Sequence, residues 1–168
     1  MEIRKETAGD YRAVLELHRQ AFGQDNEARL VEALRRSTAF VPELSLVAEN
    51  DSKIVGHILF TKVTIGEIGH ESLALAPVAV VPKEQRQGIG SALIKKGLER
   101  AIELGFDSVV VLGHDSFYPR FGFMPANSWN ITTEYDSPDS TFALELKQDA
   151  LTGVSGQVRY PKEFAFVS

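Results

Sequence analysis

Cysteine is absent from the 168 residues of this chain. Disulfides, thiolate metal sites and cysteine nucleophiles are therefore excluded together, so a covalent acyl-enzyme route would need another side chain. Long apolar runs are missing as well, since no segment approaches the roughly 20 residues that span a bilayer, and residues 1–7 have no apolar core of signal-peptide length. These absences predict a soluble, cytoplasmic protein with no membrane partner.

An excess of positive charge is also missing. The formal net charge is −5, and no basic stripe alternates with aromatic residues, so we expect no nucleic-acid partner. Residues 83–100 differ, because five basic and two acidic side chains make them locally +3 and leave −8 for the remainder. This division suits an anionic cofactor on one side and a cationic, amine-bearing substrate elsewhere, although a solvated helix face would explain it equally well.

The pattern that is present indicates one α/β domain over residues 1–168, long enough to bury roughly 70% of its unfolded surface. Apolar residues at helical spacing predict the helices, while apolar runs and alternation predict the strands. The expected strands are 3–4, 44–49, 54–63, from 73, 108–112 and 141–147, and the helices are 11–22, 27–36, 88–104 and a short one capped by Ser116. We expect residues 127–140 to form a long loop.

The most informative segment is 73–91, where an apolar strand leads into Gln85-Arg-Gln-Gly-Ile-Gly90 and then an amphipathic helix. Glycine lets backbone N–H groups converge, and the first turn of a helix offers unpaired donors and a positive dipole end to an anion. A dinucleotide fingerprint would need glycine in place of Leu93, and a P-loop would need lysine in place of Ser91. The segment predicts a diphosphate loop, with a plain strand-to-helix turn as the alternative.

Gln85-x-x-Gly88-x-Gly90 resembles the pyrophosphate loop of the GNAT superfamily of acyl-CoA-dependent N-acetyltransferases, and residues 151–164 resemble the tail of its YhbS-like subgroup. Residues 117–123, Phe-Tyr-Pro-Arg-Phe-Gly-Phe, resemble the family's Phe-Tyr-x-x-x-Gly-Phe segment. The resemblance implies an α/β fold, α+β in some schemes, with a mixed, mostly antiparallel central sheet, a splayed central strand pair and flanking helices. One departure is Val111, where many members have asparagine.

The resemblance also implies acetyl-CoA as cosubstrate, no metal, and an amine-bearing small molecule or peptide as acceptor. Tyr118 would be the general acid. The backbone N–H of Val80 would donate to the oxyanion if Pro77 and Pro82 make the strand splay. The residues expected to bind the cosubstrate are Val78, Ala79, Val80, Gln85, Arg86, Gln87, Gly88, Ile89, Gly90, Ser91 and Tyr118.

The base that accepts the amine proton is left open by the sequence. His114 and Asp115 follow a central strand, where open α/β sheets place their sites, and histidine titrates near neutral pH. His57 and Glu71 are further candidates, each with buried hydrogen bonding or simple solvation as the alternative. Water relays would remove the need for any side-chain base.

Two other functions remain compatible with the sequence: a non-catalytic regulatory module that binds acyl-CoA, and a transferase of a different acyl group. Whether the chain forms a homodimer is also open. Trp129 and Tyr135 could contact substrate, although aromatic residues in such a loop more often anchor it to the core.

Overall fold

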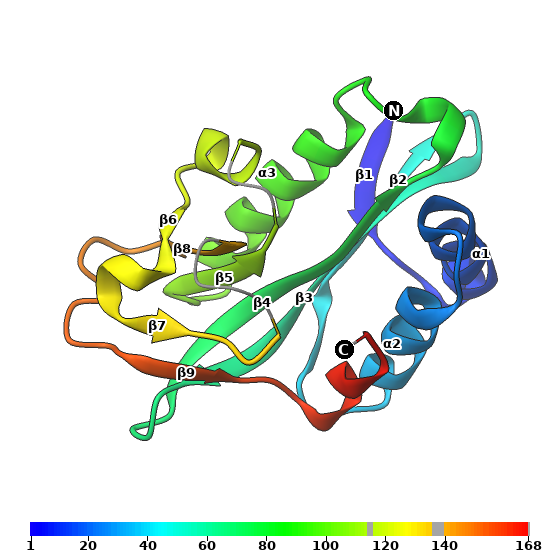
Figure 1. The fold of residues 1–168 in the computed structure, drawn as a ribbon. Coiled ribbons are helices and arrows are strands. Elements are labelled where there is room, and N and C mark those ends of the chain that lie inside the picture. The colour runs from blue at the N-terminus through cyan, green and yellow to red at the C-terminus, as the bar shows by residue number, and fades with distance from the viewer. Residues whose placement is uncertain (114–115, 136–139, 168) are drawn as a thin grey trace.

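A strongly twisted β-sheet forms the centre of the protein (Figure 1). The computed structural model describes residues 1–113, 116–135 and 140–167. Within these residues the main sheet has the order β1-β2-β3-β4-β5-β8-β6, and only β4 and β5 run parallel. Its strands are β1 (Glu2–Lys5), β2 (Phe40–Asn50), β3 (Lys53–Ile65), β4 (His70–Val80), β5 (Ser108–Leu112), β6 (Met124–Pro125) and β8 (Thr141–Glu145). The predicted mixed, mostly antiparallel sheet is confirmed.

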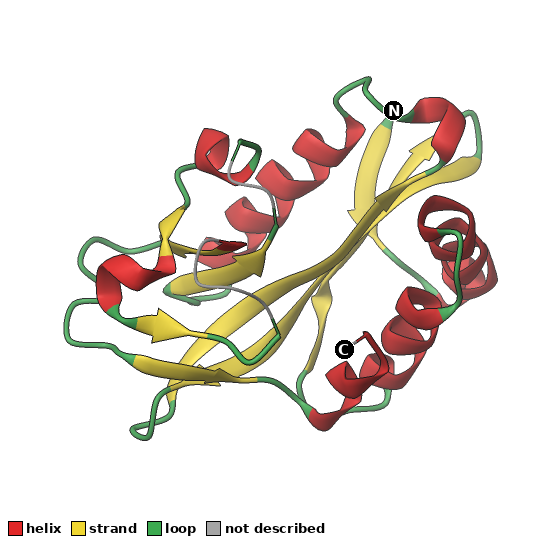
Figure 2. Cartoon of the chain, in the orientation of Figure 1, coloured by secondary structure: helices red, strands yellow, loops and turns green. Residues whose placement is uncertain are grey.

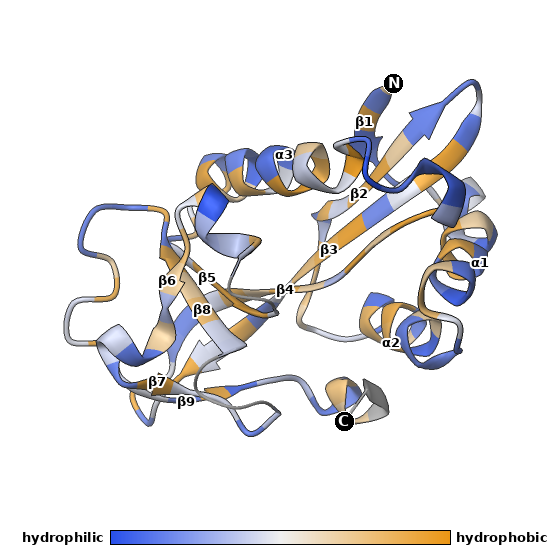
Figure 3. Cartoon of the chain, turned by 45° about the horizontal axis from the view of Figure 1, so that its top comes forward, coloured by the Kyte–Doolittle hydropathy of each residue, from blue (hydrophilic) through white to orange (hydrophobic). Residues whose placement is uncertain are grey.

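Helices cover both faces of this sheet (Figure 2). The helices α1 (Tyr11–Phe22) and α2 (Asn26–Arg35) pack on one face, and α3 (Ile89–Glu103) packs on the other. Successive strand side chains point to opposite faces, so Leu46 joins the α3 core while Val47 joins the core under α1 and α2. Figure 3 shows hydrophobic and hydrophilic residues on each helix, and strands in which hydrophobic residues are interspersed with hydrophilic ones. Across the described ranges, no helix is long and apolar enough to cross a membrane.

The predicted unit of strand, helix and strand is formed by β4, α3 and β5. Gly105 has the left-handed conformation (φ 91°) expected just beyond the helix end. The apolar stripe of α3 is buried as predicted, except for Ile102, which is 49% exposed. Gly97 explains this correction. A Cβ at Gly97 would overlap the Phe60 ring, so the helix approaches the sheet most closely on the side that carries Gly97. Ile102 lies outside the part of the helix surface that contacts the sheet.

The central strands β4 and β5 separate soon after they meet. They pair only at Leu73 with Val109 and at Ala74 with Val110, although β4 continues to Val80. On its other side, the register of β4 against β3 shifts between Ile58 and Phe60, opposite the segment that contains Pro77. Proline has no N–H for the ladder, so regular pairing fails there. The predicted bulge and splayed strand pair are present.

Two local predictions need correction. Part of the expected loop is ordered structure: a 3-10 helix (Ala126–Trp129) is followed by β7 (Ile131–Thr132), which pairs with an unpredicted strand, β9 (Gly156–Arg159). Residues 136–139 of that loop lie outside the described residues. The short helix, Tyr118–Phe121, is not capped by the Ser116 side chain, because Phe117 occupies its N-cap position. Gly122, with φ 97°, ends this helix as predicted.

A buried chain of hydrogen bonds ties α1 and α2 to the sheet. His18 Nε2 lies 2.8 Å from His57 Nδ1, and His57 Nε2 lies 2.9 Å from Ser45 Oγ. Ser45 Oγ donates to the Glu6 carboxylate at 2.6 Å, and Arg35 donates to both Glu6 oxygens. Since the Ser45 proton goes to the carboxylate, Ser45 accepts from His57, and His57 in turn accepts from His18. The hydrogen bonds from His18 through His57 and Ser45 therefore all run toward the Glu6 carboxylate, to which Arg35 donates from its other side.

Candidate active site

The segment between β4 and α3 has the geometry of an anion-binding loop. A short 3-10 turn (Pro82–Glu84) leads to two left-handed residues, Arg86 (φ 66°) and Gly88 (φ 87°). Left-handed residues inside a turn are typical of backbone nests that bind anions. Gly88 is the N-cap residue of α3, so the N–H groups of the first helical turn have no partner within the helix. The helix dipole adds positive potential at the same point.

A groove of about 460 Å³ lies over this loop and contains most of the predicted binding residues. Arg86 and Arg120 bring positive charge to its wall, against Glu84 alone on the acidic side. Of the predicted loop residues, Gln87 is not part of the wall. The lining residues are Val80, Glu84, Gln85, Arg86, Gly88, Ile89, Gly90, Ser91, Phe117 and Arg120.

Gly90 borders open space in this groove. Its φ is not in the left-handed region, and a Cβ added there would contact only Val80 Cγ2, at 3.9 Å. Neither backbone conformation nor internal packing therefore requires glycine at position 90. A larger side chain would project into the groove.

The groove continues along the splayed end of β4 into a second cavity of about 200 Å³. The two share Val80, Gln85, Gly90 and Phe117. The other lining residues of the second cavity are Ala21, Phe22, Val78, Ala79 and Ile94. A mostly apolar channel therefore leads from the anion-binding loop toward the point where β4 and β5 separate.

The backbone of β4 presents donors to this channel. The Val81 N–H donates to Val55 O of β3 at 2.9 Å, and N–H groups alternate in direction along a strand. The N–H groups of Val78 and Val80 therefore point away from β3, into the gap beside β4. The Gln85 side-chain amide supports this orientation, because it donates to Val80 O from the same side at 3.0 Å.

A third cavity, of about 250 Å³, contains Tyr118. Its lining residues are Phe22, Glu27, Leu30, Leu75, Ala76, Pro77, Val78, Leu112 and Tyr118. The tyrosine ring packs edge-on against Phe117 and Phe123, with centroid distances of 5.1 and 5.7 Å. A Cβ at Gly113 would overlap this ring. Burial raises the pKa of the Tyr118 hydroxyl, so this hydroxyl is protonated at neutral pH.

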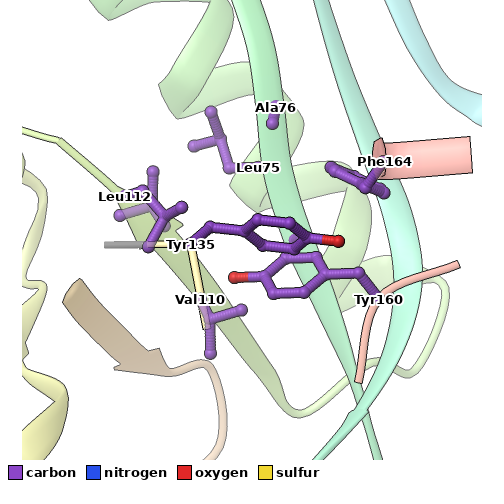
Figure 4. Close-up of a pocket in the computed structure, with 9 residues that line it drawn as sticks. Leu75, Ala76, Val110, Leu112, Tyr135, Tyr160 and Phe164 are labelled. Atoms are coloured by element: carbon purple, nitrogen blue, oxygen red, sulfur yellow. The ribbon is translucent and has the colours of Figure 1, made fainter. Parts of the chain in front are cut away.

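A fourth cavity, which we name the tyrosine pocket, adjoins the third and shares Leu75, Ala76 and Leu112 with it (Figure 4). Its volume is about 160 Å³. The rings of Tyr135 and Tyr160 lie against each other in its wall, edge to face, with centroids 4.9 Å apart (Figure 4). The lining residues are Ala74, Leu75, Ala76, Val110, Val111, Leu112, Tyr135, Tyr160 and Phe164.

The structure places the candidate bases in different surroundings. His114 and Asp115 lie outside the described residues. His57 is fully buried and pairs with Ala79 across the sheet; burial, followed by the charges of His18 and Arg35, lowers its pKa well below the usual value. Glu71 is exposed near the opposite end of β4 from Val80.

Three site residues were not singled out from the sequence. Glu27, in the first turn of α2, looks like an ordinary acidic residue at a helix start. Arg120 lies inside the segment 117–123 that resembles the family, but no feature of the sequence distinguishes it as a binding residue. Tyr160 follows β9, and its place beside Tyr135 depends on strand pairing that the sequence does not reveal.

Known proteins share the sequence and the fold of this chain. Residues 11–123 match the Acetyltransferase (GNAT) family. The chain is 44% identical over 147 residues to the uncharacterized N-acetyltransferase YjhQ of Escherichia coli K12, covering 86% of this chain and 80% of YjhQ. It is 34% identical to the uncharacterized N-acetyltransferase YhbS of the same strain over 166 residues, 98% of each protein.

Solved structures agree with this relationship. The crystal structure of YhbS from Escherichia coli in complex with CoA has a TM-score of 0.91 at 33% identity, over 98% of this chain and 91% of that one. A GNAT family acetyltransferase from Brucella melitensis in complex with acetyl-CoA has a TM-score of 0.81 at 33% identity, over 97% of each chain. The family match spans the anion-binding loop and Tyr118. This chain therefore belongs to the GNAT family of acetyltransferases.

Proposed function

We propose that this N-acetyltransferase binds acetyl-CoA along the groove and transfers the acetyl group to a primary amine by direct attack. The continuity of the cavities carries the proposal: each shares lining residues with the next, from the loop at 85–91, past Val80, to Tyr118. The relatives support the donor, because YhbS was solved with CoA and the Brucella protein with acetyl-CoA.

The anion-binding loop would hold the diphosphate of CoA. The backbone N–H groups of Gln87, Gly88, Gly90 and Ser91 are the proposed donors, and Arg86 adds charge. Arg120, from the other wall of the groove, is a second cation. The space at Gly90 supports the fit, because nothing in the protein itself requires it.

The splayed end of β4 would hold the reacting acyl group. Acetyl-CoA supplies an activated acyl carbon. The Val78 N–H would bind the pantetheine arm, and the Val80 N–H would donate to the carbonyl oxygen as negative charge develops on it. One such preorganised donor contributes roughly 3–4 kcal/mol to transition-state stabilisation. These donors are available because β5 does not pair with this part of β4.

Tyr118 would assist the leaving thiolate. As the amine nitrogen bonds to the acyl carbon and the C–S bond breaks, the hydroxyl donates toward sulfur. A tyrosine with pKa ~10 is a weaker acid than a thiol with pKa ~8.5, and burial raises the pKa of Tyr118 further. We therefore assign Tyr118 a hydrogen bond to the developing thiolate, and the departing CoA thiolate takes its proton from water.

The amine must also lose a proton. His57 is a poor base for this step, because its lowered pKa makes it a weak proton acceptor and both of its ring nitrogens are already hydrogen-bonded, to His18 and Ser45. We retain His114 as the proposed side-chain base and a water relay as the alternative.

Thiol release from acetyl-CoA, measured with a broad panel of amines, tests the reaction. Amine-dependent release is expected. A folded protein that binds CoA but releases no thiol with any amine would instead be a regulatory acyl-CoA-binding module. Equal or better use of propionyl- or succinyl-CoA would favour transfer of a different acyl group.

Replacing Tyr118 by phenylalanine tests the role of its hydroxyl. We expect Tyr118→Phe to lose turnover and to keep its affinity for CoA, because the ring still packs against Phe117 and Phe123. Tyr11→Phe is the matched control, since Tyr11 is 39% exposed on α1 and lines none of the four cavities. Unchanged turnover in Tyr118→Phe would remove this hydroxyl from the mechanism.

A further inference from the structure

We propose that the acceptor is a small monoamine with an apolar body about the size of one aromatic ring. Its nitrogen lies against Glu27 in the cavity of Tyr118, and its ring fills the tyrosine pocket (Figure 4). This assignment rests on the proposed acetyl transfer and adds the chemical class of the acceptor.

The size of the tyrosine pocket fits a single ring. Its volume is about 160 Å³, and an apolar cavity of about 150 Å³ is large enough to bind benzene. From β4 the wall of this pocket receives the small side chains of Ala74 and Ala76 together with Leu75. Tyr135, Tyr160 and Phe164 supply aromatic walls, and such walls favour ring contacts with edge-to-face or offset geometry.

The chemistry of the tyrosine pocket excludes a second charge on the acceptor. Of the described residues that line it, none carries a charge. Burial raises the pKa of both Tyr135 and Tyr160, so their hydroxyls are neutral. A carboxylate or a second ammonium group in this pocket would lose hydration and meet no opposite charge on the described lining residues, which is unfavourable. Amino acids and diamines should therefore be poor acceptors.

Glu27 brings a carboxylate to the adjoining cavity, the one that contains Tyr118. Its carboxylate accepts hydrogen bonds from the neutral Gln24 amide at 3.1 and 3.2 Å. The arginines within eight residues of Glu27 have other partners: Arg19 and Arg29 each pair with Asp25 at 2.7 Å, and Arg35 pairs with Glu6 at 2.8 Å. Judged on the described ranges, no Lys, Arg or His nitrogen lies within 4.0 Å of the Glu27 carboxylate. Its charge is thus available to a substrate ammonium group.

The positions of Glu27, Tyr118 and the tyrosine pocket in two adjoining cavities give the acceptor one orientation. Glu27, Val78 and Tyr118 line a single cavity, so a nitrogen held by Glu27 lies in the cavity where Tyr118 would meet the thioester. The tyrosine pocket opens from that cavity through the shared residues Leu75, Ala76 and Leu112. A monoamine whose ring enters the tyrosine pocket therefore keeps its amine near the acyl group.

A matched panel of acceptors tests the class. We expect kcat/KM for 2-phenylethylamine to exceed that for ethylamine, which lacks the ring, by about tenfold or more. Phenylalanine adds a carboxylate to 2-phenylethylamine, and 1,4-diaminobutane carries a second ammonium group. Both should have kcat/KM values as low as that of ethylamine. A peptide with a free N-terminus completes the panel. Better turnover of the diamine, the amino acid or the peptide would overturn the inference and leave acetyl transfer intact.

Replacing Glu27 by glutamine tests the charge without changing the shape. Glu27→Gln should lower kcat/KM for 2-phenylethylamine by about tenfold, because a charge-assisted contact is lost. Its affinity for CoA should not change. Glu16→Gln is the control, because Glu16 accepts from a glutamine amide, Gln20, as Glu27 does from Gln24, but is exposed on α1 and lines none of the four cavities. Equal losses in both variants, or none in Glu27→Gln, would contradict the role of Glu27.

Replacing Tyr160 tests the ring contact. Tyr160→Ala should raise KM for 2-phenylethylamine by about tenfold and leave KM for ethylamine unchanged. Tyr160→Phe should stay close to the wild type, because it keeps the wall and loses only the hydroxyl, which receives a 3.3 Å hydrogen bond from Thr133. If Tyr160→Ala raises KM for both amines equally, Tyr160 supports only the folded structure and the proposed ring contact is wrong.

Direct binding separates failure of the inference from failure of the proposed reaction. Calorimetric titration of 2-phenylethylamine into the CoA-bound protein needs no turnover. Binding that is weakened by Glu27→Gln and Tyr160→Ala, without thiol release, would support the pocket and overturn acetyl transfer. Thiol release with other amines and no binding of 2-phenylethylamine would do the reverse.

Discussion

Mild acid should destabilise this protein through its two buried histidines. Burial, helped by the charge of Arg35, lowers the pKa of His18 to about 4. Burial, followed by the charges of His18 and Arg35, lowers the pKa of His57 well below 6.5. Glu6 lies only 3.9 Å from His57, but Arg35 neutralises its carboxylate. Both histidines are thus neutral in the folded protein and take up protons near pH ~6.5 when it unfolds.

The magnitude follows from proton uptake. Below pH ~6.5 the unfolded state binds more protons, so the free energy of unfolding falls as the pH falls. Well below pH ~6.5 each histidine contributes about 1.4 kcal/mol per pH unit, and the two together about 2.7; averaged from about pH 7 to about pH 5, where the unfolded histidines are only partly protonated, the two contribute about 2 kcal/mol per pH unit. For His18 alone, the interval from 6.5 down to about 4 corresponds to about 3 kcal/mol. That is a large share of the roughly 5–15 kcal/mol typical of a folded protein.

Urea unfolding between about pH 7 and about pH 5 measures this slope. His18→Leu should halve it, whatever the variant loses in absolute stability, because one of the two protons is removed. The control is His70→Asn, since the His70 side chain is 24% exposed and pairs with Asp107 at 3.2 Å. A wild-type slope below about 1 kcal/mol per pH unit, or an unchanged slope in His18→Leu, would refute the assignment of neutral buried histidines.

Glycine positions give three further predictions. Gly90→Val should abolish the thermal stabilisation by CoA, which at a hundredfold excess over Kd is worth about 2.7 kcal/mol; persistent stabilisation would place CoA elsewhere. Gly113→Ala should displace the Tyr118 ring and reduce turnover while CoA affinity is kept, and a fully active variant would contradict this. Gly97→Ala should lower the free energy of unfolding by about 1–3 kcal/mol, because its Cβ would overlap Phe60; thermal denaturation checks this.

The local chemistry of the chain was predictable from its sequence. The anion-binding loop, the helix after it and the left-handed Gly105 each depend on residues within one or two turns of the position concerned. The same holds for Gly122, which ends the short helix after Tyr118. Conformational preference, helix spacing and capping act over such short ranges, so the loop and the central unit around α3 could be predicted.

Long-range placement was not predictable in this way. β9 is short, and its pairing with β3 and β7 joins segments far apart in the sequence. His18 is hidden in a hydrogen-bonded chain that draws on four other segments. Single-sequence patterns contain no signal for partners so distant.

The sequence by itself determined the family, the diphosphate loop and the position of Tyr118, because these are written in contiguous motifs. Only the tertiary structure showed that Glu27, Tyr135 and Tyr160 border connected cavities beside that tyrosine. The physical reason is that backbone donors and helix ends are set by local sequence. A pocket, in contrast, is the space that several distant side chains fail to fill once the sheet has twisted and its central strands have separated.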